Sequence, residues 1–294
     1  MASSPSADID VPPELVRRLL RAQHPELAGL PLELVANGWD NAIYRLGADL
    51  VVRLPRRQLA AALIRNEQRW LPDIAARVDV AVPRPLRIGT PTPWFPWYWT
   101  VSTWFDGTTA ASLPRPERTG LAEPLATFLT ELHTPAPVDA PANRFRGVPL
   151  EHRNADMVER LTSGRVPEGT GVATVWRNAV AAPLWDGPPL WLHGDLHPAN
   201  LLVRNHGLSA VLDFGDLTAG DPATDLAAAW LVFDGAGRKQ FRSAVTRSRF
   251  VSEATWLRAR GWALCVATAL VGNSDDSPLF HQMGSEIITE VLSD

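Results

Sequence analysis

Residues 190–225 constrain the fold of this chain more than any other segment. Two apolar runs in this segment, Leu201–Arg204 and Ser209–Leu212, flank an Asn-His-Gly triplet, which is a pattern that predicts a β-hairpin. A short hairpin brings its two open ends together. Asn200, just before the first strand, and Asp213, just after the second, are therefore expected to lie side by side.

Asp195 adds a second carboxylate to this end of the hairpin, because it stands on the loop that leads to Asn200. Two carboxylates and an amide oxygen are the hard oxygen ligands that suit Mg²⁺, which commonly bridges the phosphates of a substrate. A carboxylate that does not bind the metal can orient or deprotonate a hydroxyl. These groups are the ones needed for phosphoryl transfer, where catalysis is mostly positioning and charge neutralisation.

The rest of the chain divides into a strand-rich part and a helix-rich part near residue 106. Predicted strands cover 32–36, 42–46, 50–54, 97–105 and 190–192, and predicted helices cover 12–23, 58–71, 119–133, 151–162, 171–182, 225–233, 238–249, 253–270 and 281–292. The predicted fold class is α+β. The strand-rich part, 1–106, is predicted to form a small N-terminal lobe, and the helix-rich part, 107–294, a larger, mainly helical lobe. The join near Thr103–Gly107 is predicted to be a hinge.

Composition excludes several other classes of protein. The formal net charge of −4 argues against a nucleic-acid binder that uses a strongly basic surface. The single cysteine, Cys265, excludes an internal disulfide framework. The apolar stretches 94–105 and 262–271 are shorter than a membrane span, and the N-terminus lacks the pattern of a secretory signal. We expect a cytoplasmic monomer or homodimer without membrane or nucleic-acid partners.

The order of motifs resembles one enzyme family. His193-Gly194-Asp195, followed by Asn200 and then by Asp213-Phe214-Gly215, is similar to the catalytic loop and metal-binding triplet of kinases. The His-Gly-Asp form, the later Gly220-Asp221-Pro222 with Asp225, and the early Gly38-Trp39-Asp40-Asn41 resemble the aminoglycoside phosphotransferase family of small-molecule kinases. This resemblance implies a two-lobed, protein-kinase-like fold, in which the N-terminal lobe, 1–106, would bind nucleotide and the C-terminal lobe, 107–294, would carry the catalytic loop, the metal site and the acceptor pocket.

The resemblance also implies roles for the residues of the loop. Asp195 would be the catalytic base that accepts the proton of the acceptor hydroxyl or orients that hydroxyl. Asn200 and Asp213 would hold Mg²⁺ bound to ATP or GTP. His193 would brace the loop, and Asp225 would hydrogen-bond to it from the following helix.

For the nucleotide, the resemblance implies a site in the N-terminal lobe. Arg53 stands where the family has a lysine, and Glu67 is its expected partner. An arginine can still neutralise phosphate charge. The other candidates are the backbone groups of Thr103 and Phe105 and a phosphate-covering loop with Gly38 and Asn41.

The sequence leaves the acceptor open. An aminoglycoside is the first expectation, on resemblance alone; a macrolide, another antibiotic, a sugar or an amino-alcohol metabolite are alternatives, because a fold and its machinery do not identify a substrate. Two readings from other classes also stay open. His193, Asp195 and His197 have the residue types of a metal-dependent hydrolase, and the replacement of lysine by Arg53 would suit a non-catalytic nucleotide-binding module.

Overall fold

The computed structural model describes residues 7–38, 40–164, 166, 170–273 and 277–294. The chain forms two compact units. The N-terminal unit contains the described residues up to Asp106 together with Ala210–Gly215, and the C-terminal unit contains Gly107–Ser209 and Asp216–Asp294. Segment 210–215 joins the N-terminal unit because Ala210 forms a parallel bridge with Ala81, and the amide of Val211 donates to the Ala81 carbonyl at 3.0 Å.

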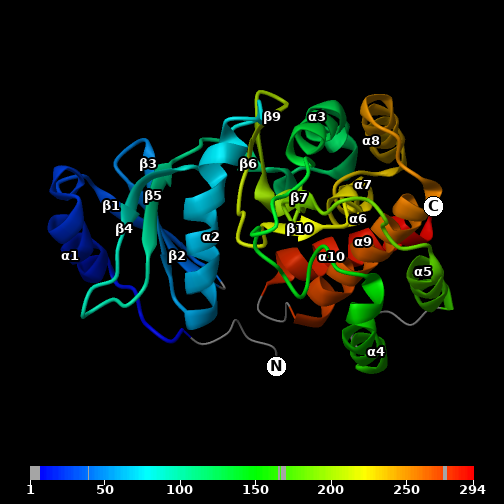
Figure 1. Ribbon diagram of the computed structural model, residues 1–294, viewed down its shortest axis with the longest axis horizontal. Helices are drawn as coiled ribbons and strands as arrows, with labels where there is room; N and C mark the ends of the chain where they lie inside the picture. Colours follow the sequence, from blue (N-terminus) through cyan, green and yellow to red (C-terminus); the bar gives the residue numbers. More distant parts are fainter. Residues whose placement is uncertain (1–6, 39, 165, 167–169, 274–276) are drawn as a thin grey trace. The chain divides into compact units, whose positions relative to one another are not determined.

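The N-terminal unit is built on one five-stranded sheet with the strand order β1-β2-β3-β5-β4 (Figure 1). Its elements are α1 (Pro13–Gln23), β1 (Leu32–Asn37), β2 (Asn41–Leu46), β3 (Leu50–Pro55), α2 (Gln58–Ala75), β4 (Pro85–Gly89) and β5 (Trp99–Thr103). Each neighbouring pair of strands is antiparallel. In the central strand β3, Arg53 stands opposite Ile43 of β2 on one side and Thr100 of β5 on the other.

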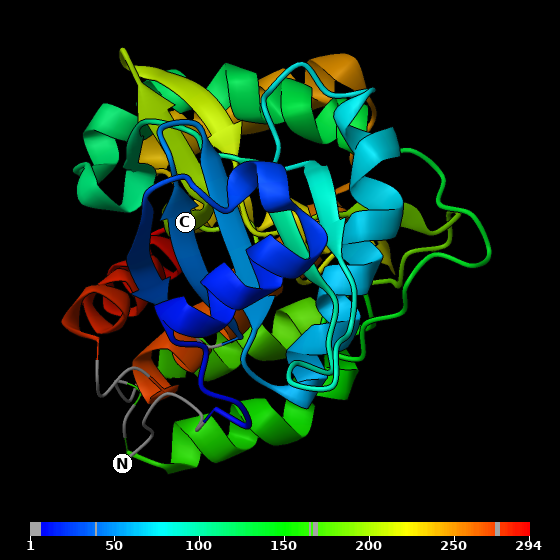
Figure 2. The same ribbon diagram turned by 90° about the vertical axis from the view of Figure 1, so that its left-hand side faces the viewer.

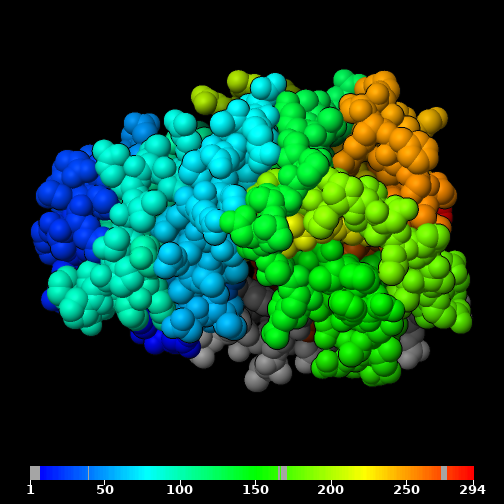
Figure 3. All heavy atoms as spheres, in the orientation of Figure 1, coloured from blue at the N-terminus to red at the C-terminus, as the bar shows by residue number. Residues whose placement is uncertain are grey.

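The two faces of this sheet are covered by different helices, with α1 and α2 on opposite sides (Figure 1). Helix α1 turns Val16, Leu19 and Leu20 to a buried core that includes Val52 and Trp99 (Figure 2, α1 in dark blue). Successive residues of a strand point to opposite faces. Arg53 therefore points away from this core. Helix α2 covers that second face and lies along the surface of its unit (Figure 3).

The C-terminal unit is mainly helical. It contains α3 (Ala122–Leu132), α4 (Asn154–Thr162), α5 (Thr170–Ala181), α6 (Ala223–Leu226), α7 (Ala228–Leu231), α8 (Gly235–Ser248), α9 (Glu253–Asn273) and α10 (Pro278–Leu292), with strands β6 (Thr108–Thr109), β7 (Leu190–Leu192), β8 (Leu201–Arg204), β9 (Gly207–Val211) and β10 (Thr218–Gly220). Helix α9 packs against α10, α5 and α6. It buries Trp256, Trp262 and Leu264, and these residues make it the centre of the helical core.

The predicted α+β class is confirmed: a small antiparallel-sheet region precedes a mainly helical one. The predicted β8–β9 hairpin is also present, and β9 continues two residues beyond the C-terminal unit. Strand β4 was not predicted, because Pro83 and Pro85 suggested a break in the chain. Pro85 is tolerated since β4 is an edge strand, where a missing ladder N–H costs little.

Two further strands, β6 and β10, were also missed. They have two and three residues and pair with β8 and β7, respectively, so no periodicity could identify them. Among the described residues, the longest helices carry too many polar side chains for any of them to cross a bilayer.

Candidate active site

The loop that follows β7 takes a backbone conformation that only glycine accepts easily. Gly194 has a φ of +87°, and a Cβ atom added there would lie 2.4 Å from the carbonyl oxygen of Asp216. Both the left-handed conformation and this close approach exclude a larger side chain. The protein kinases' arginine therefore cannot occupy this position in this loop, which explains the His-Gly-Asp form.

Asp225 fixes this loop from helix α6. Its carboxylate accepts hydrogen bonds from the backbone N–H groups of His193, at 2.8 Å, and Gly194, at 2.9 Å. The Nε2 atom of His133 lies 3.0 Å from the same carboxylate. Burial opposes the ionisation of Asp225, but the contacts with His133, together with His193 and the Gly194 amide, hold its pKa below the ordinary value. The hydrogen bond predicted from Asp225 to the loop is confirmed.

Asp195 lies at the centre of a set of polar contacts. One carboxylate oxygen is 3.3 Å from Nε2 of His197 and 3.4 Å from the side-chain nitrogen of Asn200. The other is 3.2 Å from a guanidinium nitrogen of Arg146. Burial favours the neutral acid, but His197, Arg146 and His193 together hold the pKa of Asp195 well below its usual range. Asp195 is therefore a carboxylate in a fixed position at any working pH.

The two histidines of the loop make structural contacts. The ring nitrogen Nδ1 of His193 accepts from the backbone N–H of Asp195 at 3.2 Å, and Nδ1 of His197 accepts from that of Ala199, also at 3.2 Å. The His197 ring also meets Phe280 of α10 edge to face. In the described ranges, no group of three or more His, Cys, Asp or Glu side chains could hold a metal ion.

Arg146 is the residue of this site that sequence reasoning missed. It reaches Asp195 from the proline-rich loop between α3 and α4, and the same nitrogen lies 3.3 Å from the carboxylate of Asp216. The loop is held by Asn143, which donates to Asp216 at 2.7 Å, and by Thr218, which donates to the Pro141 carbonyl at 2.9 Å. A lone arginine in a proline-rich segment carries no sequence signal, so only the tertiary structure identifies it.

We expect Arg146→Gln to raise the pKa of Asp195 and to lower kcat several-fold. The substitution removes a positive charge beside the carboxylate and one of the contacts that orient it. Carbon-13 NMR of the Asp195 carboxyl group during a pH titration measures the first effect. Arg144→Gln is the matched control, because Arg144 stacks on Phe145. An unchanged Asp195 titration in Arg146→Gln would contradict the assigned role.

A second cluster of candidate residues lies within the N-terminal unit. The pairing predicted for Arg53 and Glu67 is confirmed, with a nitrogen-to-oxygen distance of 2.5 Å, and both side chains are buried. Arg53 also lies 3.4 Å from the carboxylate of Asp213. Burial disfavours the guanidinium charge, but Glu67 and Asp213 raise the pKa of Arg53. Arg53 therefore presents a permanent, oriented positive charge beside Asp213.

Asp213 has an uncommon backbone conformation for a residue other than glycine, with a φ of +58°. Its side chain is 55% exposed, and Oδ1 accepts from the Gly215 N–H at 3.3 Å. Asn200, in the C-terminal unit, donates its side-chain N–H to the Asp195 carbonyl at 2.9 Å, so its amide oxygen points elsewhere. Each residue thus keeps an oxygen available for a hard cation, and both are suitable ligands for Mg²⁺.

The remaining predicted nucleotide residues lie at the ends of strands. The N–H of Gly38 donates to the Asn41 carbonyl at 2.9 Å and closes the β1–β2 turn. The Asn41 side-chain oxygen is buried without a hydrogen-bond partner. Trp39, part of the same motif, lies outside the described residues. Thr103 ends β5 opposite Leu50, and Phe105 follows the strand half-buried.

We expect Arg53→Ala to raise the KM for nucleotide by about tenfold or more, because a charge-assisted hydrogen bond to phosphate is lost. Arg53→Lys should keep most of the affinity, since the lysine restores the charge. Initial rates against nucleotide concentration measure both. Nucleotide KM values that do not differ between Arg53→Ala and the parent would assign Arg53 a purely structural role in its ion pair with Glu67.

Comparison with known proteins agrees with this geometry. Residues 31–262 match the phosphotransferase enzyme family. A search of curated protein sequences found no match. Three solved structures share the fold at low identity: APH(2")-IIia with GDP and kanamycin (TM-score 0.71, 19% identity, 95% of this chain and 98% of that one), macrolide 2'-phosphotransferase type I (0.64, 22%, 94% and 97%), and APH(2")-IIa with streptomycin and ATP (0.60, 18%, 96% and 97%).

These similarities confirm the predicted resemblance and the predicted kinase-like fold. The family match also extends over most of both units, from the first strand of the sheet to helix α9. The chain therefore belongs to the phosphotransferase enzyme family.

Proposed function

We propose that this enzyme transfers the γ-phosphoryl group of ATP or GTP to a hydroxyl of a small molecule. The observation that carries the proposal is the fixed position of Asp195, whose carboxylate is oriented by His197, Asn200 and Arg146. Phosphoryl transfer needs positioned groups more than it needs covalent catalysis. A carboxylate that is always ionised and held on three sides suits the orientation of an acceptor hydroxyl.

Each residue then has a distinct task. Asp195 accepts a hydrogen bond from the acceptor hydroxyl and takes its proton as the oxygen bonds to phosphorus. Because the pKa of Asp195 is low, it is a weak base and acts mainly by orienting the hydroxyl. Arg53 binds phosphate oxygens, while Glu67 fixes its guanidinium. Thr103, Phe105, Gly38 and Asn41 stay candidates for contacts with the nucleotide.

Asn200 and Asp213 are the proposed ligands of Mg²⁺. When bound, the ion would neutralise charge on the phosphates of the nucleotide. Asp213 is suited to this task by its exposed carboxylate and by the backbone conformation that presents it. The neighbouring Arg53 would keep the site from accumulating negative charge before the cation binds.

We expect Asp213→Ala to abolish Mg²⁺-dependent turnover, with a loss of kcat of about 100-fold or more, because phosphate charge would no longer be neutralised in a fixed geometry. Rates measured across a Mg²⁺ titration test this expectation. Asp216→Ala is the informative comparison, since Asp216 contacts Arg146 instead of Arg53. An unchanged Mg²⁺ dependence in Asp213→Ala would remove Asp213 from the metal site.

An aminoglycoside-type antibiotic is the first proposed acceptor, on the similarity to structures that contain kanamycin and streptomycin. One observation favours a second candidate, a macrolide or another acceptor with little positive charge. Arg146 already pairs with the carboxylates of Asp195 and Asp216. The negative charge of Asp195 is thus already paired and less available to a polycationic acceptor, whereas a nearly neutral acceptor needs no such counter-charge.

A mass-spectrometric screen tests the function and identifies the acceptor. The protein, Mg²⁺ and a mixture of ATP and GTP are incubated with aminoglycosides, macrolides, peptide antibiotics and hydroxylated metabolites. A product heavier by one phosphoryl group, formed by the parent and absent with Asp195→Asn, is the expected result. Nucleotide binding without a phosphorylated product from any acceptor class would favour the non-catalytic module.

A further inference from the structure

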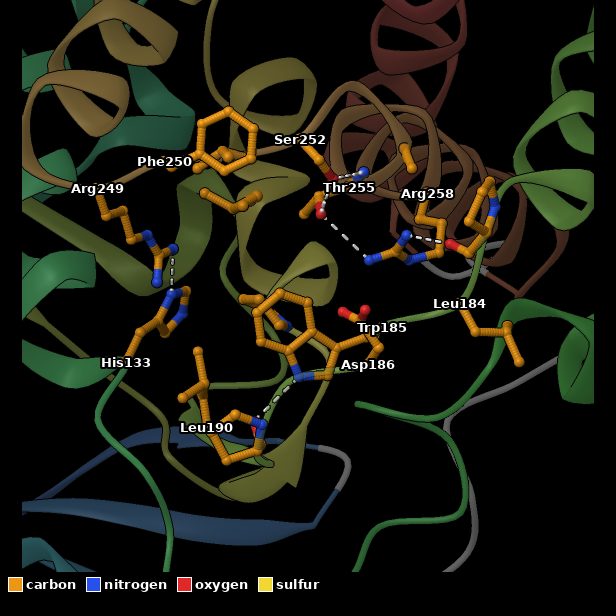
Figure 4. Close-up of a pocket in the computed structure, with 16 residues that line it drawn as sticks. His133, Leu184, Trp185, Asp186, Leu190, Arg249, Phe250, Ser252, Thr255 and Arg258 are labelled. Atoms are coloured by element: carbon orange, nitrogen blue, oxygen red, sulfur yellow. Dashed lines mark hydrogen bonds between the residues drawn. The ribbon is translucent and has the colours of Figure 1, made fainter.

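A cavity of about 650 Å³ lies within the C-terminal unit, apart from the proposed catalytic and metal residues. The cavity is lined by residues at the end of α3, in the loop before β7, at both ends of α6, in the α8–α9 connection and in the first turns of α9 (Figure 4). A volume of this size suits a small organic molecule. None of Asp195, Asn200 or Arg146 is among its lining residues.

Much of the lining is apolar, and part of it faces solvent. Phe250 is 88% exposed and Leu184 is 57% exposed, so both side chains present apolar surface to solvent. The indole of Trp185 is held in place by its Nε1–H, which donates to the Pro188 carbonyl at 3.0 Å (Figure 4). An aromatic ring that enters the cavity would bury these surfaces against its own faces and edges.

Arg249 supplies a positive charge at one side of this cavity. One of its terminal nitrogens lies 2.6 Å from Nδ1 of His133, and its buried Nε atom has no hydrogen-bond partner among the residues that the structure describes. Burial lowers the pKa of His133, so the ring is neutral: it accepts from Arg249 and donates from Nε2 to Asp225. No carboxylate of the described residues forms an ion pair with Arg249 directly. The charge of Arg249 is therefore oriented by His133, and Asp225 acts on it only from behind that ring, without a direct contact.

The other charged side chains that line the cavity are not placed to bind an anion or to neutralise Arg249. Arg258 is committed to Asp221, with nitrogen-to-oxygen distances of 2.6 and 3.2 Å. Asp186 is exposed to solvent and lies beyond the Trp185 ring from Arg249 in the view of Figure 4. A ligand that neutralises Arg249 must bring its own negative charge, and a planar carboxylate matches the donor geometry of a guanidinium.

We propose that this cavity is a second binding site, for a small aromatic carboxylate whose ring packs on Trp185 and Phe250 and whose carboxylate binds Arg249. The site is connected to the catalytic loop by a chain of contacts. Arg249 contacts His133, His133 contacts Asp225, and Asp225 accepts the N–H groups of His193 and Gly194. A ligand that engages Arg249 thus changes the support of Asp225, and through it that of the loop.

Isothermal titration calorimetry with three naphthalenes of matched shape tests the binding site. We expect 2-naphthoate to bind, and neutral 2-naphthamide and cationic 2-naphthylmethylamine to bind about tenfold more weakly or not at all. Arg249→Gln should weaken 2-naphthoate by about tenfold or more, while Arg249→Lys should keep part of the affinity. The control, Arg247→Gln, changes an exposed arginine in the last turn of α8, two residues before Arg249, that pairs with Glu123.

Three results would each overturn the proposed site: no binding of 2-naphthoate, equal affinities for the three naphthalenes, or unaltered 2-naphthoate binding in Arg249→Gln. Hydrogen exchange tests the connection: bound 2-naphthoate should alter the exchange rate of the His193 and Gly194 amides by about threefold or more. Unchanged exchange with saturating ligand would refute the connection. Neither measurement requires turnover, so the outcome is independent of the kinase assay.

Discussion

Replacement of Asp195 by asparagine is expected to lower kcat by about 10²–10⁴-fold, which is the range for loss of a positioned acid–base group. The amide keeps the shape of the side chain but cannot accept the proton of the acceptor hydroxyl. It also turns an N–H₂ group toward donors in either orientation, because one carboxylate oxygen faces His197 and Asn200 and the other faces Arg146. Steady-state kinetics with the acceptor identified by the screen measures the loss.

Nucleotide binding separates this effect from a general failure of the fold. The proposed nucleotide residues Arg53 and Glu67 belong to the N-terminal unit, whereas Asp195 belongs to the C-terminal unit. Asp195→Asn should therefore bind ATP or GTP with a Kd within about threefold of the parent, equivalent to less than 1 kcal/mol. Near-parental kcat in a variant that binds nucleotide normally would show that Asp195 is not the group that acts on the hydroxyl.

Replacement of Asp225 by alanine is expected to cost about 3–5 kcal/mol of stability in the C-terminal unit. The carboxylate is fully buried and satisfies the N–H groups of His193 and Gly194 as well as Nε2 of His133. Its removal leaves these donors without an acceptor in a place that water does not reach. The melting temperature from calorimetry should fall, and turnover should fall with it, because the loop that carries Asp195 loses its support.

Two comparison variants test the specificity of this result. Asp225→Asn keeps one acceptor oxygen and should be intermediate in stability. Glu123→Ala removes an exposed carboxylate that pairs with Arg247 at 2.8 Å, and such surface pairs contribute about 0–1 kcal/mol. If Asp225→Ala melted no earlier than Glu123→Ala, the buried hydrogen bonds of Asp225 would not be what holds the loop.

The local sequence determined the strands and helices that carry this site and the motif residues within it. Short runs rich in apolar residues predicted β1, β2 and β3, and longer segments of helical character predicted α1, α2 and α9, because these patterns depend on neighbours along the chain. The hairpin and the motif around it pointed to Asp195 as the candidate catalytic residue and to Asn200 and Asp213 as the candidate metal ligands. The partner of Arg53 was also predictable, since Glu67 stands on the helix that follows the strand.

Contacts between distant segments were decided only by the tertiary structure. The sequence alone did not indicate that Arg146 reaches Asp195 from a proline-rich loop, that His133 supports Asp225, or that segment 210–215 belongs with the N-terminal unit. The physical reason is that a side chain's charge state and orientation depend on the groups that surround it in space, which are brought together by folding. Residue type and spacing thus determine which groups are present, and packing determines which of them act on one another.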